Sequence, residues 1–112
     1  MVNEERSALR QVNRAARKLK KRIDKLENSE RWKKMEVWER YLEHDHLIWS
    51  AVWHIPLRMH KSIASLTSWL ESRALLTDYY KDNRSKPTRR DVRELCVYAL
   101  LVKSVYATEE VR

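Results

Sequence analysis

Glycine is absent from this chain of 112 residues, and its absence excludes several kinds of functional site. Phosphate-binding loops, nucleophile elbows and dinucleotide fingerprints all need a residue that tolerates positive φ or a close backbone approach. Tight hairpins lose their best turn residue, and no stretch sustains the alternation of apolar and polar residues seen in half-buried strands. The sequence therefore predicts an all-α protein without a glycine-based catalytic loop.

Cysteine and long apolar runs are also scarce. The single cysteine, Cys96, excludes an internal disulfide, and its apolar neighbours predict a buried, inert thiol. Uncharged stretches such as residues 47–57 and 95–102 are shorter than the ~20 residues of a membrane-spanning helix. The N-terminus lacks the apolar segment of a signal peptide. We therefore expect no integral membrane association and a location in the cytoplasm or on the nucleoid.

Positive charge, by contrast, is abundant and unevenly distributed. Residues 1–34 hold 12 of the 24 Lys and Arg residues, against five carboxylates. These residues sum to +7, residues 35–83 to −2 and residues 84–112 to +3, which gives the net charge of +8. Basic clusters at both ends are typical of proteins that bind the phosphates of nucleic acids or anionic lipids.

The apolar residues near the N-terminus are spaced three and four apart, which predicts one helix over residues 3–27 with a narrow apolar seam. Most of the remaining helix surface is basic. We expect this helix, within residues 1–28, to project as an arm or to pair with a second copy, beside a helical core formed by residues 29–112. The predicted dimerisation residues are Leu9, Val12, Ala16, Leu19, Ile23 and Leu26.

The chain as a whole predicts a three- or four-helix bundle. Ser29 is the expected N-cap of a second helix, which Pro56 ends or kinks; a single continuous helix through residue 29 is the alternative. An aromatic stripe is expected to face the core, because phenylalanine is absent and tryptophan must fill that volume. The expected inward residues of the second helix are Met35, Trp38, Leu42, Trp49, Val52 and Trp53.

Two further helices are expected, over residues 57–82 and after Pro87. Thr88 followed three residues later by Asp91 is typical of a helix start, with Thr88 as the N-cap. The uncharged residues 95–102 predict that the middle of the last helix lies at the centre of the core. The expected inward residues of the third helix are Met59, Ile63, Leu66, Trp69, Leu70 and Leu76.

Histidines and carboxylates cluster between residues 39 and 60 without forming a recognisable metal site. Glu43 and His46 have the spacing of carboxylate-bridged di-metal bundles, but these need a second such pair, which the sequence lacks. Tetrahedral zinc would require three or four ligands to converge, with His54 approaching a helix face that carries Glu39, Glu43 and His46. The serines lack a glycine loop that would form an oxyanion hole. We expect no metal, no cofactor and no enzymatic activity.

The distribution of charge favours a non-enzymatic helical protein that binds DNA or RNA through phosphate. A small subunit of a nucleoprotein assembly, or an accessory protein of a phage or plasmid, would have these properties. Trp32 lies among basic residues and is the expected stacking residue for a base, and the start of the last helix is the second expected phosphate contact. The predicted nucleic-acid-binding residues are Arg10, Arg14, Arg17, Lys18, Lys20, Lys21, Arg22, Lys25, Arg31, Trp32, Lys33, Lys34, Arg84, Lys86, Arg89, Arg90 and Arg93.

The alternative is a helical protein–protein interaction module that docks its basic face on an acidic partner protein. A dimeric adaptor and a viral or phage inhibitor are examples of this class. Peripheral membrane binding by the basic helix is less well supported, because its seam lacks bulky aromatic residues. Polar substitutions at Leu19 and Ile23 would test dimerisation, whereas charge reversal at Lys20 and Lys21 would test phosphate binding.

Overall fold

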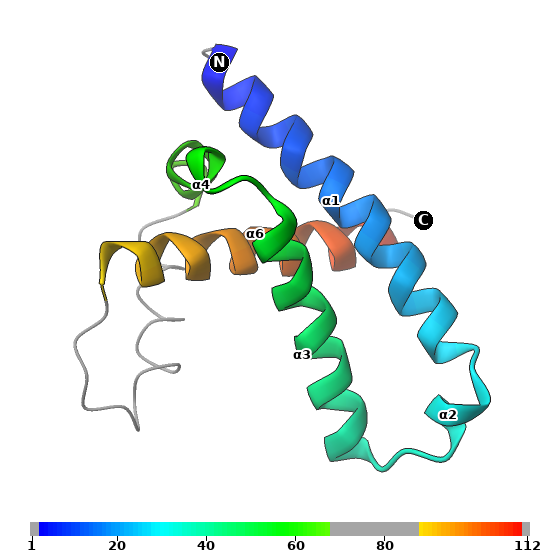
Figure 1. Cartoon of the computed structure of the whole chain (residues 1–112). Coiled ribbons are helices and arrows are strands. Elements are labelled where there is room, and N and C mark those ends of the chain that lie inside the picture. Colours follow the sequence, from blue (N-terminus) through cyan, green and yellow to red (C-terminus); the bar gives the residue numbers. More distant parts are fainter. Residues whose placement is uncertain (1–2, 68–87, 111–112) are drawn as a thin grey trace.

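The computed structural model describes residues 3–67 and 88–110, apart from the side chains of residues 107–110, and it is all-α as predicted. In these ranges the chain forms the helices α1 (Asn3–Glu27), α2 (Glu30–Lys33), α3 (Val37–His54), α4 (Leu57–Ala64) and α6 (Arg89–Glu110), and no strand. Helices α1 and α3 run in opposite directions, joined through α2, and α6 crosses both (Figure 1).

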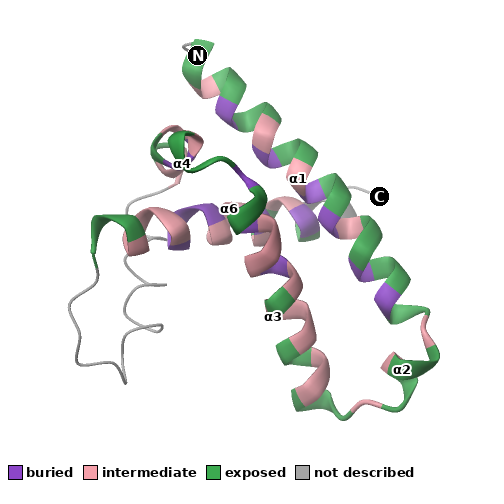
Figure 2. Cartoon of the chain, in the orientation of Figure 1, coloured by how far each residue is buried: buried purple, intermediate pink, exposed green. Residues whose placement is uncertain are grey.

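Helix α1 lies against the rest of the chain and does not project from it. One side of α1 contacts α3, α4 and α6, and its buried positions recur along the whole helix (Figure 2). The helix is therefore part of the core, which corrects the expectation of an arm beside a separate core of residues 29–112. The buried residues of α1 are Ala8, Val12, Ala16, Leu19, Ile23 and Leu26.

The buried seam of α1 differs from the predicted one at its first position. Ala8 has no exposed surface, whereas Leu9 is 39% exposed. A seven-residue rhythm places Leu9 in the seam, but in a straight helix of 3.6 residues per turn Ala8 continues the line of Val12 and Ala16. The other predicted dimerisation residues are buried within this single chain. The chain's own helices cover this seam, so it is not exposed for the predicted coiled-coil dimer.

The connection between α1 and α3 contains one short helix. Ser29 is the N-cap of α2, and its Oγ accepts a hydrogen bond from the backbone N–H of Trp32 at 3.2 Å. The chain then leaves the helix and starts again at Val37. Ser29 therefore has its predicted capping role, but the helix it caps is a single turn, and neither a continuous helix nor a helix from residue 30 to 55 forms.

Only the C-terminal half of α3 packs into the core. Ile48 and Val52 are its buried residues, and α6 crosses α3 towards this half (Figure 1). Trp38 is 61%, Leu42 55% and Trp53 63% exposed. The prediction that these three residues face inward is wrong, because the apolar stripe of α3 is longer than the part that other described helices cover.

Pro56 separates α3 from α4, as predicted. Ile55 before it has an extended backbone (φ −72°, ψ 128°), because the proline ring disfavours the helical region for the preceding residue. Helix α4 ends at Ala64, so the helix predicted over residues 57–82 stops early, and Trp69, Leu70 and Leu76 lie outside the described residues. His60 is buried, and its Nε2 lies 3.1 Å from the Ile55 carbonyl oxygen. This contact connects α4 to the turn between α3 and α4.

Helix α6 passes through the centre of the molecule. Leu95, Cys96, Val97 and Leu101 are buried, which confirms the central position predicted for its uncharged middle and the burial of the thiol. The core joins these residues to the seam of α1 and to Ile48, Val52 and Ile63. None of the described helices is long and apolar enough to span a bilayer.

Candidate functional site

The side of α1 that faces away from the core carries a dense set of cations. All of them are exposed, and none has a hydrogen-bond or ion-pair partner among the residues that the structure describes. Figure 2 shows exposed positions alternating with the buried ones along this helix. We call this set the cationic face, and its residues are Arg10, Arg14, Arg17, Lys18, Lys21, Arg22 and Lys25.

Carboxylates are kept off the cationic face. The sequence of α1 has no acidic residue between Glu5 and Asp24. Asp24 pairs with Lys20 at 3.3 Å, and Glu27 Oε1 lies 3.2 Å from Nε2 of His44. Lys20, a predicted phosphate ligand, therefore already has a carboxylate partner within α1, whereas the seven cations of the face do not.

The charge density of the cationic face is close to that of a nucleic-acid strand. From Arg10 to Lys25 the helix rises roughly 22 Å at 1.5 Å per residue. Seven charges over this length average about one every 3 Å, against roughly one phosphate every 3.4 Å along each strand of duplex DNA. The cationic face can therefore neutralise a continuous run of phosphates.

A hollow beside the cationic face lies between α1 and the C-terminal half of α6. It has a volume of about 670 Å³, and Ala16, Ser104 and Val105 form part of its lining. Side chains of α1 supply the rest of the wall and make it strongly basic. The cations around this hollow are Arg14, Arg17, Lys18, Lys20 and Lys21.

The basic residues of α2 are largely neutralised within the chain. Arg31 lies 3.5 Å from Glu43, and Lys33 lies 3.3 Å from Glu30, while Lys34 is exposed. Each of these two pairs is itself exposed and screened, so it offsets charge without adding much stability.

Trp32, the predicted stacking residue, already stacks within the chain. Its ring lies against the imidazole of His44, with centroids 4.8 Å apart and an interplanar angle of 15°. The Arg40 guanidinium lies 5.1 Å from the Trp32 ring centroid, and its Nε donates to the Trp32 carbonyl oxygen at 3.1 Å. These contacts attach α2 to α3 and give the Trp32 ring a structural role.

The second predicted phosphate contact, around the start of α6, is not brought next to the cationic face. Arg84 and Lys86 lie outside the described residues. Arg89 and Arg90 are exposed and Arg93 is half-buried, while Arg90 pairs with Glu94 at 3.1 Å. The hollow reaches α6 at Ser104 and Val105, roughly 22 Å along the helix from Arg89 at 1.5 Å per residue. The two basic regions are therefore separate.

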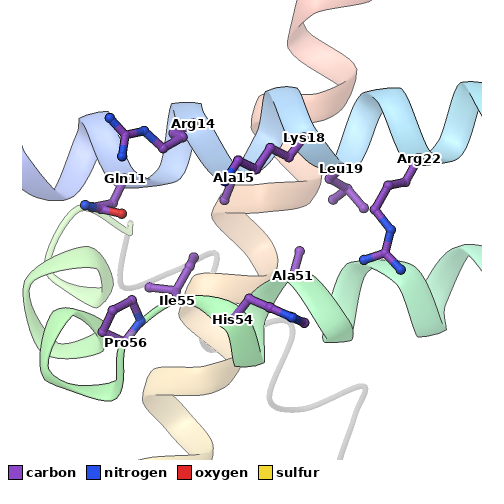
Figure 3. Close-up of a pocket in the computed structure, with 10 residues that line it drawn as sticks. All are labelled: Gln11, Arg14, Ala15, Lys18, Leu19, Arg22, Ala51, His54, Ile55 and Pro56. Carbon is purple, nitrogen blue, oxygen red and sulfur yellow. The ribbon is translucent and has the colours of Figure 1, made fainter.

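A narrower groove runs along the other side of α1, between α1 and α3 (Figure 3). Ala15 of α1 and Ala51 of α3 point into the gap, and because both side chains are small the helices leave a space of about 200 Å³. Sequence analysis missed this groove. The sequence feature that could have indicated it is the pair of alanines beside the predicted apolar stripes. These alanines come together only because α1 packs against α3.

Three neighbouring histidine and carboxylate side chains of α3 are engaged in separate contacts. Glu43 pairs with Arg31, His44 contacts Glu27, and Asp45 accepts a hydrogen bond from the Tyr98 hydroxyl at 2.6 Å. In the part of the chain that the structure describes, no group of three or more His, Cys, Asp or Glu side chains is placed to hold a metal ion.

Comparison of this chain with protein-family models, with curated proteins and with solved structures finds no match. The geometry of the site is therefore the basis for the function proposed below.

Proposed function

We propose that this chain is a non-enzymatic nucleic-acid-binding protein that holds a run of phosphates on the cationic face of α1. The observation that carries the proposal is the unbroken set of exposed cations without partners among the described residues. Among the predicted nucleic-acid-binding residues, Arg31, Lys33 and Arg90 have carboxylate partners. The cationic face is therefore the part of the set best suited to an external anion.

Mutual repulsion on the cationic face supports an anionic ligand. Cations four residues apart on a helix repel each other by roughly 0.2–0.5 kcal/mol per pair, and this face contains several such pairs, for example Arg14 with Lys18 and Arg17 with Lys21. The arrangement destabilises the isolated helix. A bound polyanion would convert this repulsion into attraction and release its own counterions.

Nucleic acid fits the cationic face better than an acidic protein does. A nucleic-acid strand carries its charge at this density along its whole length. A protein partner would need an equally dense line of carboxylates over roughly 22 Å of α1. The phosphate backbone therefore meets the requirement without any special sequence.

Binding to labelled single- and double-stranded DNA and RNA over a range of salt concentrations tests the proposal. Arg17→Gln/Lys21→Gln should weaken binding and reduce the slope of log affinity against log salt by about 1.8 for a duplex, roughly 0.9 for each lost phosphate contact. Arg31→Gln/Lys33→Gln makes the same change in net charge at ion-paired residues and should leave the slope nearly unchanged. No binding at low salt, or equal losses in both variants, would overturn the proposal.

The second candidate is a protein-interaction module that docks its basic face on an acidic partner, and the exposed apolar surface of α3 favours it. Val37 is 81%, Trp38 61%, Tyr41 69% and Leu42 55% exposed, and nucleic-acid binding through α1 does not use them. Tighter binding to polyglutamate than to a polynucleotide of equal charge, at the same salt concentration, would favour this candidate.

A further inference from the structure

The groove between α1 and α3 combines an apolar floor with a cationic wall. Leu19 and Ile55, both buried, close its floor together with the facing Ala15 and Ala51. Arg22 extends from α1 towards α3 at one end (Figure 3). The three cations that line the groove, all of them members of the cationic face, are Arg14, Lys18 and Arg22.

Two polar side chains complete the rim and offer both kinds of hydrogen bond. The Gln11 amide can donate and accept. The Nδ1 atom of His54 lies 2.7 Å from the Ser50 carbonyl oxygen, and since a carbonyl only accepts, Nδ1 carries the proton. In the neutral ring, Nε2 is then left as an acceptor. Donors and acceptors above an apolar floor suit a flat, polar-edged ring.

The size of the groove limits what it can hold. Its volume of about 200 Å³ is below the roughly 300–1,000 Å³ typical of pockets that enclose a whole small-molecule ligand. The groove therefore suits one ring system that belongs to a longer ligand. Because its cationic wall is continuous with the cationic face, the rest of that ligand carries negative charge.

We propose that this groove receives one unstacked base of a single-stranded nucleic acid whose phosphates lie on the cationic face. The inference rests on the proposed function and adds the strand type. A duplex keeps its bases paired and stacked, whereas a single strand can place a base in an apolar slot and offer its edge to polar side chains. An acidic peptide would also meet the cations, but the carboxylate side chains that carry its charge are not flat rings with donors and acceptors on their edges.

Filling the groove tests the inference directly. In Ala51→Leu the larger side chain occupies the space between the helices and remains compatible with a helix. Affinity for a single strand should fall roughly five- to hundredfold, the order that the loss of one base contact costs a single-strand-binding protein, while affinity for a duplex of equal charge stays the same. Ser7→Leu adds a leucine of the same size at an exposed position of α1 outside the groove, and should change neither affinity.

A second pair of variants covers the case in which Ala51→Leu disturbs the fold. Gln11→Ala and His54→Ala remove only rim groups, and each should reduce the affinity for a single strand. Each should also reduce the fluorescence change that a purine analogue in the strand shows when it enters the groove. If Ala51→Leu and both rim variants bind single strands as the wild type does, the groove proposal is overturned and the phosphate-binding proposal stands. Equal or tighter binding of duplex by the wild-type protein would also overturn it. If the wild type binds neither form at low salt, both proposals fail.

Discussion

Tyr98 joins the middle of α6 to α3 through both its ring and its hydroxyl group. The ring stacks on Trp49 with centroids 4.7 Å apart, and the hydroxyl donates to Asp45 Oδ1 at 2.6 Å. Burial raises the pKa of the Tyr98 phenol above its ordinary value of 10.0, and the hydrogen bond to the Asp45 carboxylate raises it further. The protonated phenol is thus the form that the folded state favours.

Replacing Tyr98 by Phe should keep the ring contact and remove the donor to a half-buried carboxylate. We expect the free energy of unfolding at neutral pH to fall by about 1.5–3 kcal/mol, since hydrogen bonds to charged groups contribute this order. Because the folded pKa is raised, the contribution is complete below pH 10.0 and is lost as pH rises through the folded-state value.

Urea denaturation of the wild type and the Tyr98→Phe variant, from neutral to strongly alkaline pH, measures this difference. The difference in the free energy of unfolding between the two proteins should become smaller at alkaline pH. Tyr41→Phe is the matched control, because Tyr41 is 69% exposed, and it should not change stability. A gap that stays constant across the alkaline range would contradict the role assigned to the hydroxyl.

At the level of elements, the start of α6 is held by a reciprocal pair of hydrogen bonds. The Thr88 backbone N–H donates to Asp91 Oδ2 at 2.9 Å, and the Asp91 N–H donates to Thr88 Oγ1 at 3.2 Å. The Thr88 backbone N–H and, after it, the Thr88 side-chain hydroxyl hold the pKa of the Asp91 carboxyl below its usual value of 3.8. This is the capping arrangement that the spacing of the two residues predicts.

Thr88→Ala should lower the free energy of unfolding by about 1 kcal/mol, as the loss of an N-cap does. Since the folded pKa of Asp91 is lowered, its stabilisation is present above the ordinary value of 3.8 and is lost as pH falls through the folded-state value. Urea denaturation across the acid range should therefore show a steeper loss of stability for the wild type than for Asp91→Asn, which lacks the titrating carboxyl group. Arg89→Ala, at an exposed neighbouring position, should keep the wild-type slope; identical acid slopes in the wild type and Asp91→Asn would refute this account.

Local rules predicted the features of each element that depend on neighbouring residues. The bounds of α1, the Ser29 cap, the break at Pro56 and the start of α6 follow from capping chemistry, periodicity and proline geometry. Tertiary contacts decided the rest. The amphipathic pattern of α3 does not say how far other helices cover it, so the exposure of Trp38 could not be predicted.

The candidate site shows the same division between local and tertiary information. The cations of α1 were identified from the sequence because the charge of a helix face depends only on spacing. Which of the predicted cations already have carboxylate partners depends on contacts such as that between Arg31 and Glu43, twelve residues apart. The groove was missed because it forms where two helices distant in sequence each present an alanine, Ala15 and Ala51.

At the scale of the whole molecule, the described residues share one core, to which α1 contributes nearly the full length of its apolar seam. Val12 and Leu19 are 1% exposed, and they belong to the same buried cluster as Val97 and Leu101 of α6. The cationic face therefore lies on a helix whose opposite side is packed into the core. A seam covered in this way also implies that disrupting it unfolds the single chain, whereas a seam shared with a second copy would make stability depend on protein concentration.

Leu19→Ala should lower the free energy of unfolding by about 2–5 kcal/mol, the range for a buried leucine truncated to alanine. Leu9→Ala is the matched control on the same helix, because Leu9 is 39% exposed against 1% for Leu19, and it should have a much smaller effect. Urea denaturation monitored by circular dichroism at low and high protein concentration gives the free energy of unfolding and shows whether the midpoint depends on concentration. Midpoints that do not move with concentration are expected, because the core is contained in one chain. Midpoints that rise with concentration in the wild type, together with similar losses in the two variants, would place the seam between two copies and refute the intramolecular core.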